Sequence, residues 1–368
     1  MVRGMVRIRT GLLAPVLLVA TLLAPVVATV PAHAAVGEQA VATGLDNPVA
    51  FTINPSDSNE LWYGELFTGE IHRRNIVTNA DSLVYTVPGV LTNGEQGLLG
   101  LALDPAFPTQ PYVYAYATRS KNGGNVNMVL RITVANGVGV KRKTIVQSPT
   151  PTPWHNGGHL RFGPDGMLWI AIGEGTEPTA AQDLNSPRGK VLRVMPDGTI
   201  PSDNPIAGNP MWAFGIRNSF GFTFDAVTGF LWLNDNGPDC NDEVNRIKRN
   251  ANYAWGENAD CRLIQAPQNT NQDGPAPRKL PEHFFPTPLG ITGAAICDGC
   301  GLDSNRKLYV GSVNTGDIYR LTFDSTRKTI VSSALYWHHA GPVISLETLP
   351  GQPIYFSDTS GIYKLVTS

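Results

Sequence analysis

The sequence predicts an all-β fold, a six-bladed β-propeller, from three observations. The chain is rich in turn-forming residues, with 38 Gly and 29 Pro among its 368 residues. No long apolar stripe follows the 3.6-residue period of a helix, which favours many short strands. The third observation is repetition: an aromatic or aliphatic strand, a turn and a second strand reading Gly-x-Ile/Val-x-Arg/Lys, or a close variant, recur along the chain.

The repeat occurs six times. The clear copies cover residues 61–74, 168–198, 230–247, 307–323 and 353–366, and a weaker copy covers 112–134. Over the residues that follow position 34, six copies leave about 55 residues each, a length typical of propeller blades. A β-sandwich is the alternative, but six similar units favour a ring, which protects the edge of each sheet.

The two ends of the chain are expected to meet. Residues 36–44 would add an outer strand to the blade made by the C-terminus and so close the ring. Because no linker is long enough to divide the chain, we interpret residues 35–368 as one domain.

Residues 1–34 have the pattern of an export signal. Three arginines lie within residues 1–9, residues 11–30 are almost wholly apolar, and residues 32–34 read Ala-His-Ala, a small-x-small cleavage site. A membrane anchor is the alternative, since about 20 apolar residues can span a bilayer. The prolines within the segment and the cleavage site favour a signal peptide. We therefore predict a secreted protein without a membrane span after cleavage.

The charge of the chain argues against nucleic acid as a partner. The formal net charge is −2 for the whole sequence. Without the three arginines of the signal segment it becomes −5, and no block of basic residues occurs. Nucleic-acid binding depends on clustered Lys and Arg, so we expect none here.

Four cysteines, an even number, suit an oxidising compartment. We favour the pairs Cys240–Cys261 and Cys297–Cys300, although four cysteines allow three connectivities. Zinc binding by the CDGC sequence at 297–300 is the alternative. It lacks a second CxxC or a histidine pair at ligand spacing.

A histidine and a carboxylate form the first candidate for catalysis. His155 is followed by Asn156, Gly157 and Gly158 and precedes a predicted strand, HLRFG. Glu174 ends the next strand, and the turn PDG would bring it back towards His155. A carboxylate beside an imidazole fixes its tautomer and raises its basicity. A lone histidine would more simply be structural, but this pairing indicates a general base.

Two further loops extend the candidate site. Arg217 lies in GIRNSFG, and Gly237-Pro238 follow the strand LWLND. These loops supply a cation and backbone carbonyls. Together with a base and a carboxylate, such a set suits proton abstraction next to a bound metal and an anionic cofactor.

In this order, the four loops resemble the soluble glucose/sorbosone dehydrogenase family, which uses pyrroloquinoline quinone (PQQ). The resemblance implies that His155 takes the proton of an anomeric hydroxyl while hydride passes to PQQ. Glu174 falls on the family's aspartate. The motif GHRNPQG matches GIRNSFG, which implies cofactor contacts for Arg217 and Asn218. In the dehydrogenase interpretation, Arg217 is also catalytic, as a cation that stabilises the developing charge.

The same resemblance implies a calcium ion and a sugar contact. Backbone carbonyls of Gly237 and Pro238 would hold the ion, and calcium accepts such oxygens. Asn236 takes the place of the polar residue that begins the family's Gly-Pro loop. Gln96, in GEQGLLGLALDPAF, lies where the family contacts sugar.

A segment after Cys240 resembles another family motif. DEVNRIKRNANYAWG is similar to DELNxIxxGxNYGWP, and some relatives use its glutamate and tyrosine for a second calcium. The matching residues are Glu243 and Tyr253. The alternative is that this segment only folds a loop, since calcium usually takes six or more oxygen ligands.

Several positions depart from the family's pattern. His159 replaces the arginine of HNGGRL, Phe220 replaces the glutamine of RNPQG, and Asn314 takes the place of a cofactor lysine. The family's arginine pair would fall within residues 338–347, which contain no Lys or Arg and offer only His338 and His339. PQQ carries three carboxylates, whose burial requires cations or many donors.

These residues support two functions. The first is an exported aldose dehydrogenase that depends on PQQ and calcium. The second is a propeller that binds carbohydrate or protein without redox chemistry, which the missing cations favour; a hydrolase or lactonase propeller is a third, weaker alternative. The sequence does not identify the sugar, the electron acceptor or the oligomeric state.

Overall fold

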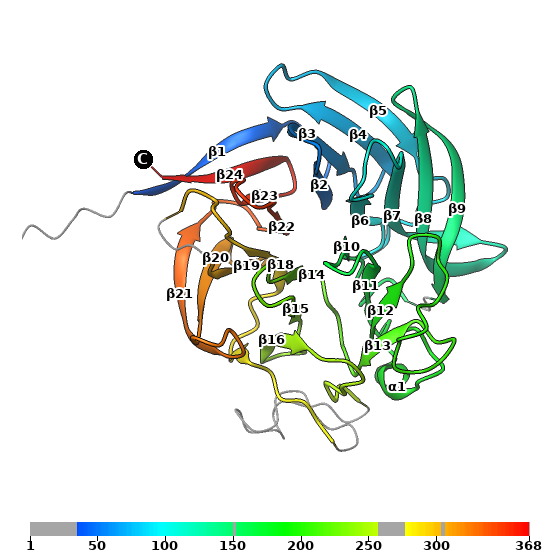
Figure 1. Cartoon of the computed structure of the whole chain (residues 1–368), viewed down its shortest axis with the longest axis vertical. Helices are drawn as coiled ribbons and strands as arrows, with labels where there is room; N and C mark the ends of the chain where they lie inside the picture. Colours follow the sequence, from blue (N-terminus) through cyan, green and yellow to red (C-terminus); the bar gives the residue numbers. More distant parts are fainter. Residues whose placement is uncertain (1–34, 150–151, 257–276, 303–305, 368) are drawn as a thin grey trace, which may run out of the picture. The chain divides into compact units, whose positions relative to one another are not determined.

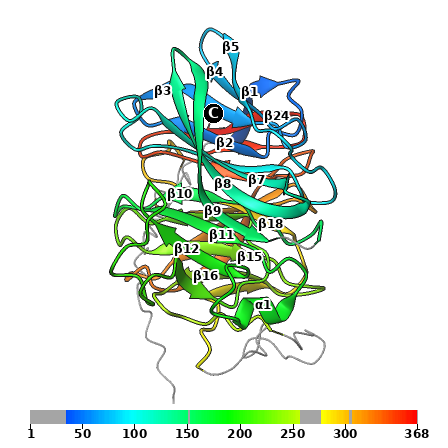
Figure 2. The same ribbon diagram turned by 90° about the vertical axis from the view of Figure 1, so that its right-hand side faces the viewer.

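The computed structural model describes residues 35–149, 152–256, 277–302 and 306–367. Six four-stranded antiparallel sheets surround a central axis in a ring (Figure 1), which confirms the predicted propeller. The same ring is seen from its side in Figure 2, where strands of successive blades lie one above another. The predicted signal peptide, residues 1–34, lies outside the described residues and stays a prediction.

Each blade runs from an innermost to an outermost strand. The innermost strands are β2 (Ala50–Asn54), β6 (Leu98–Leu103), β10 (Leu160–Phe162), β14 (Gly221–Phe224), β18 (Ile291–Ile296) and β22 (Ser345–Glu347). The second strands are β3 (Asp57–Gly64), β7 (Tyr112–Lys121), β11 (Leu168–Ile172), β15 (Leu231–Asp235), β19 (Leu308–Ser312) and β23 (Tyr355–Ser357). The third strands are β4 (Glu70–Asn75), β8 (Gly124–Ala135), β12 (Lys190–Val194), β16 (Asp242–Ile247), β20 (Asp317–Phe323) and β24 (Gly361–Thr367). The outermost strands are β5 (Asp81–Thr86), β9 (Val138–Pro149), β13 (Met211–Phe214), β17 (His283–Phe285), β21 (Ile330–His338) and β1 (Val36–Thr43).

The ring closes as predicted. Strand β1 pairs with β24, with Val36 opposite Thr367 and Thr43 opposite Gly361. The six sequence repeats also find their explanation, because each contains the second and third strands of one blade. The described residues contain one helix, the short α1 (Pro178–Gln182). It lacks the length and hydropathy of a membrane-spanning helix.

Six hydrophobic clusters hold the ring together, one between each pair of adjacent blades. Successive side chains of a strand point to opposite faces of its sheet. Tyr114 therefore packs against the third blade and its neighbour Ala115 against the first, and both are fully buried. Strands covered on both faces read as apolar runs, which is why LWIAI at 168–172 shows no polar alternation.

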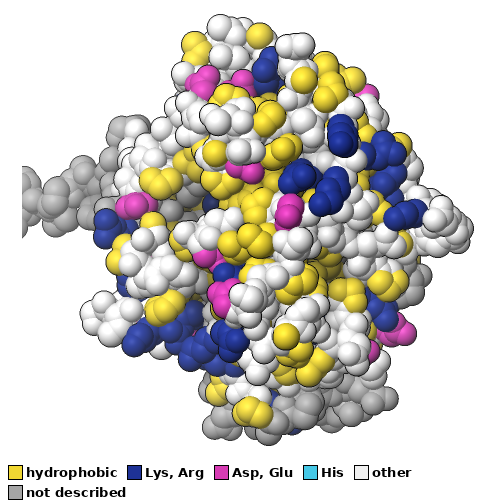
Figure 3. Space-filling view, turned by 45° about the vertical axis from the view of Figure 1, so that its right-hand side comes forward, with side chains coloured by type: hydrophobic (Ala, Val, Ile, Leu, Met, Phe, Trp, Pro, Cys, Tyr) yellow, Lys and Arg dark blue, Asp and Glu magenta, His cyan; other side chains and the backbone are white. Residues whose placement is uncertain are grey.

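The described disulfide joins Cys297 and Cys300, as predicted, and this pairing excludes zinc binding by these two thiols. The Cys240–Cys261 pair stays a prediction because Cys261 lies outside the described residues. On the face drawn in Figure 3, Lys and Arg side chains form separate groups, with hydrophobic atoms exposed near the middle.

Candidate active site

A cavity of about 370 Å³ lies at one end of the propeller axis. Its lining residues precede or begin the innermost strands, or belong to the loops after the second strands, so every blade contributes. The polar lining residues are Asn47, Glu95, His155, Arg217, Asn218, Asn236, Thr292 and Asn314. The apolar ones are Val49, Leu66, Leu99, Phe220, Val313 and Ile344. Five residues predicted from the sequence (His155, Arg217, Asn218, Asn236 and Asn314) thus meet in one cavity.

The predicted pair of His155 and Glu174 is present. Nδ1 of His155 lies 2.5 Å from Oε1 of Glu174, whose side chain is 1% exposed. The hairpin of β10 and β11 creates this contact, because Leu160 lies opposite Ile170 and the strands bring the flanking residues together. Glu174 does not line the cavity but contacts the imidazole of His155, which does.

The backbone of His155 is strained and closely packed. Its φ is 58°, in the left-handed region that a non-glycine residue rarely adopts, and such strain is common at functional sites. A Cβ on Gly173 would lie 2.2 Å from the carbonyl oxygen of His155, so only glycine fits at that position. Gly175 N–H donates to the same carbonyl over 3.0 Å. These contacts fix the direction of the imidazole.

Glu95 is a site residue that the motifs of the sequence did not indicate. Its Oε2 accepts the backbone N–H of His155 at 2.6 Å and that of Asn156 at 3.4 Å. Both Glu95 oxygens also accept from Nδ2 of Asn218 at 3.2 Å. Its neighbour Gln96, predicted as the sugar contact, is buried and donates to the carbonyl of Thr152 instead. The substrate role of Gln96 stays a prediction, but the residue of this turn that lines the cavity is Glu95.

Arg217 and Asn218 are held by another carboxylate that was not predicted, Asp235. The two carboxylate oxygens accept the backbone N–H groups of Arg217 at 3.0 Å and Asn218 at 2.7 Å. Burial raises the pKa of Asp235 to about 6, although these two bonds favour its ionised form. Burial also lowers the pKa of Arg217, against the attraction of Asp235, Glu174 and Glu95.

The side chain of Arg217 is held by two contacts. Nη1 donates to the carbonyl of Asn236 over 3.0 Å, and the guanidinium lies over the ring of Trp255 at 5.2 Å. Nε of Arg217 is buried and has no hydrogen-bond partner among the described residues. An unpaired buried donor is costly in a folded protein, so its presence beside a cavity points to a ligand.

The Asn236–Pro238 loop has a matching unpaired acceptor. Asn236 donates through Nδ2 to the carbonyls of Asn218 and Ile291, but its Oδ1 is buried and has no partner among the described residues. Asp242 holds the loop by accepting from Gly237 N–H at 3.0 Å and Leu289 N–H at 2.8 Å. Burial raises the pKa of Asp242. Oxygen ligands and buried acid side chains are therefore grouped here.

His338 and His339, the only candidates within residues 338–347 to replace the family's arginine pair, do not take that place. His339 is buried and lies 3.0 Å from Glu38 and 3.2 Å from Asp358. His338 is exposed and lies 2.8 Å from Asp317. Neither lines the cavity, whose wall from this stretch is Ile344. Arg217 is thus the one cation among the described lining residues.

Glu243 and Tyr253 occupy different parts of the fourth blade. Glu243 is the second residue of β16 and lies opposite Asp235 in the sheet register. The hydroxyl of Tyr253 donates to the carbonyl of Arg246 and accepts from Lys248 N–H, at the other end of the same strand. These bonds give Tyr253 a role in folding the loop, and a calcium site at these two residues stays a prediction.

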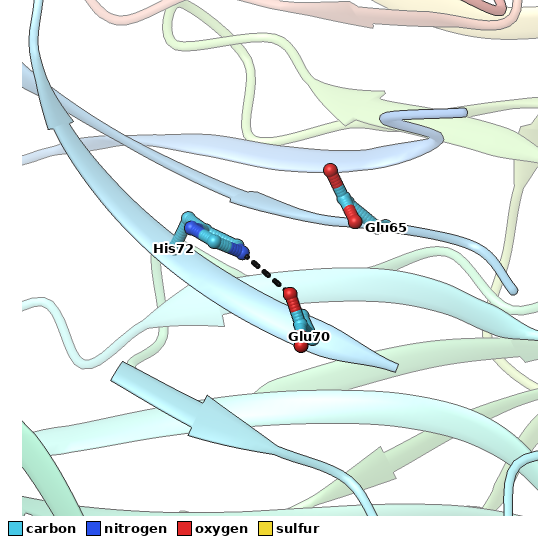
Figure 4. A group of neighbouring side chains, drawn as sticks. All are labelled: Glu65, Glu70 and His72. Atoms are coloured by element: carbon cyan, nitrogen blue, oxygen red, sulfur yellow. Dashed lines mark hydrogen bonds and ion pairs between the residues drawn. The ribbon is translucent and has the colours of Figure 1, made fainter. Parts of the chain in front are cut away.

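One other group of potential metal ligands occurs among the described residues, at Glu65, Glu70 and His72 (Figure 4). Both imidazole nitrogens of His72 already have carboxylate partners, Glu70 and Asp81, each at 3.1 Å. His72 therefore belongs to a hydrogen-bond network on the first blade, while Glu65 accepts from the backbone N–H of Asp46 and the hydroxyl of Thr68. None of the three residues lines the cavity.

The chain is similar to known proteins along most of its length. A sequence model described as glucose/sorbosone dehydrogenase matches residues 41–363. The chain is 30% identical over 317 residues to the aldose sugar dehydrogenase YliI of Escherichia coli (strain K12), which covers 81% of this chain and 83% of that protein. It is 29% identical over 250 residues to quinoprotein glucose dehydrogenase B of Acinetobacter calcoaceticus, covering 59% of this chain and 52% of that one. The PQQ-bound aldose sugar dehydrogenase of Streptomyces coelicolor has a TM-score of 0.78 at 26% identity, covering 92% of this chain and 99% of that one.

Proposed function

Because the chain belongs to the glucose/sorbosone dehydrogenase family, we propose that it oxidises the anomeric hydroxyl of an aldose, with PQQ as hydride acceptor and calcium beside it. One observation carries this proposal: a histidine braced by a buried carboxylate shares a cavity with an arginine that has an unpaired donor. The relatives' names, which include a quinoprotein and a PQQ-bound enzyme, support the choice of cofactor.

His155 is the proposed general base. With Nδ1 directed at Glu174, Nε2 is the nitrogen left to accept the hydroxyl proton. The buried carboxylate stabilises the imidazolium that forms, and Glu95 and Gly173 keep the ring in place. A positioned general base of this kind accelerates a reaction by about 10²–10⁴.

This part of the site offers oxygen ligands for a cation and N–H donors for an anion. The carbonyls of Gly237 and Pro238 and the unpaired Oδ1 of Asn236 are oxygen ligands of the kind calcium takes. Nε of Arg217 is available to an anionic group, and Asn314 adds an amide at the rim. When bound, PQQ would supply the carbonyl that accepts hydride, since such cofactors carry the redox chemistry that side chains lack.

The small number of cationic side chains in the cavity should limit its affinity for PQQ. Three cofactor carboxylates would face Arg217 as the one cation among the described lining residues. We therefore expect micromolar rather than nanomolar PQQ binding, a difference of about 4 kcal/mol. Calcium would contribute a large share of what remains. The same shortage favours the second candidate, a propeller that binds carbohydrate without redox chemistry.

We also propose that the enzyme is exported. The expected signal peptide at residues 1–34 and the Cys297–Cys300 disulfide support this, because disulfides persist in oxidising compartments.

Calorimetric titration of PQQ into the protein, with calcium or with a chelator, tests the proposal. A micromolar Kd that the chelator abolishes, together with dye reduction on an aldose panel, is expected. Nanomolar binding would contradict the inferred cation shortage. If no binding is detected at about 100 μM PQQ, the propeller that binds carbohydrate without redox chemistry is favoured. Even a Kd near 1 mM would give measurable occupancy at that concentration.

A further inference from the structure

A second cavity, of about 340 Å³, lies at the opposite end of the axis from His155. Its lining includes residues at the far ends of five innermost strands: Ile53, Leu103, Phe162, Phe224 and Glu347. Between the two cavities lies a space of only about 10 Å³ beside His159. That volume admits about one water molecule. A ligand in the second cavity therefore cannot reach His155 along the axis.

An ion pair forms the polar part of this cavity. Nη2 of Arg161 donates to Oε2 of Glu347, whose side chain is 9% exposed. These two are the only charged side chains among the described lining residues. A guanidinium has five N–H donors, and within the described residues the other nitrogens of Arg161 make no hydrogen bond. Donors therefore remain for a ligand.

A buried imidazole next to the pair is also unsatisfied. Nε2 of His159 is buried without a hydrogen-bond partner among the described residues. It lies 3.9 Å from Oε1 of Glu347, beyond hydrogen-bonding distance. His159 lines the small space between the two cavities and not the second cavity itself. A water molecule in that space would satisfy the imidazole and leave Arg161 and Glu347 to a ligand.

The remaining walls are apolar and partly aromatic. Phe162 and Phe224 are half-buried, and Leu101, Leu103 and Leu349 complete the surface. Because the ion pair has no net charge, neither an anion nor a cation is favoured. A hydroxyl group can accept from Arg161 and donate to Glu347, and the C–H face of a sugar ring packs well on aromatic side chains.

We propose that this second cavity is a non-catalytic binding site for neutral carbohydrate. Its volume is at the lower end of the range for small-molecule sites, which suits the end unit of an oligosaccharide. The site is independent of the proposed oxidation, since the two cavities share no lining residue and only the water-sized space lies between them.

Hydrogen exchange of the full chain, with and without millimolar maltotriose, locates the binding site. We expect protection of segments 160–164, 222–226 and 345–349. Ala226, which is exposed and lines the cavity, allows a blocking variant that does not disturb the core. Ala226→Trp should abolish that protection, and Ala226→Ser, the matched control, should retain it.

A second pair of variants tests the polar contacts. Arg161→Lys keeps the charge opposite Glu347 but loses the planar fork of donors. We expect it to weaken maltotriose binding at least about tenfold, while Asn314→Ala, in the first cavity and away from the space between the two, leaves protection of the second cavity unchanged. Protection confined to segments 95–99, 155–158 and 217–220, or no protection at any concentration, would overturn the proposal.

Discussion

The carboxylate of Glu95 accepts the backbone N–H of His155 over 2.6 Å, although 60 positions separate the two residues. The same carboxylate accepts from Asn218, which in turn accepts from Gly157 N–H at 3.1 Å. Glu95 thus connects loops of the second, third and fourth blades around the proposed base. Since a bond to the main chain of His155 restricts its position, Glu95 acts as a positioning residue.

We expect Glu95→Gln to lower kcat about tenfold, a loss of about 1.4 kcal/mol of transition-state stabilisation. Both carboxylate oxygens of Glu95 accept hydrogen bonds, whereas the amide of Gln has one oxygen and one NH2 group. The NH2 group would face a donor of His155 or Asn218, and that contact would become repulsive. Steady-state dye reduction measures kcat. Glu70→Gln, outside the cavity, is the control, and equal kinetics in the two variants would contradict this role.

The His155–Glu174 pair gives a graded prediction. His155→Ala should lower kcat by about 10² or more, because it removes the general base. Glu174→Gln should cost less, about tenfold, because an amide oxygen still accepts from Nδ1 but carries no charge. The stabilisation of either variant by calcium, measured as a shift in Tm, should match that of the wild type. His155→Ala activity within about threefold of wild type would remove His155 from the mechanism.

The fold could be predicted because each blade is specified by a short stretch of sequence. In the copy at 61–74, Leu61 and Trp62 enter different hydrophobic clusters, which requires a strand covered on both faces. The contact of His155 with Glu174 could be predicted for the same reason, since a single hairpin makes it.

Contacts made by ring closure could not be predicted in this way. His339 is paired with Glu38, 301 positions earlier, because β1 joins the C-terminal blade. From the sequence alone, His339 could not be assigned this partner and was a candidate for contact with the cofactor. The choice between Glu95 and Gln96 could not be predicted either, because Glu95 meets His155 only when the second and third blades pack together.

A cation added to the cavity should strengthen PQQ binding. Asn314 lines the cavity at its exposed rim and donates only weakly, to Pro288 O at 3.4 Å. Asn314→Lys would place an ammonium there at a small cost of desolvation. A hydrogen bond to a charged group contributes about 1.5–3 kcal/mol, so the Kd should fall by about one to two orders of magnitude. Calorimetric titration measures it, with Asn314→Gln as the neutral control. Equal affinities for the Lys and Gln variants would show that the cofactor carboxylates do not reach this rim.

Acid should destabilise the protein through His159. Burial lowers the pKa of His159 to about 3, and the nearby Arg161 guanidinium adds to this effect. Its pKa in the unfolded chain is near 6.5, so between these values the unfolded state binds a proton that the folded state does not. Stability from this residue is therefore complete above pH 6.5 and is lost as the pH falls towards 3.

Between pH 7 and pH 5, this loss amounts to about 2 kcal/mol of unfolding free energy. His159→Gln removes the titrating group while keeping a polar side chain of similar size. The difference in unfolding free energy between wild type and His159→Gln should therefore fall by about 2 kcal/mol over that range. Urea unfolding followed by tryptophan fluorescence at both pH values gives the difference, and His338→Gln, at an exposed histidine, is the control. Parallel pH dependence in wild type and His159→Gln would mean that the buried imidazole takes up a proton without unfolding, with Glu347, 3.9 Å away, as its counter-ion.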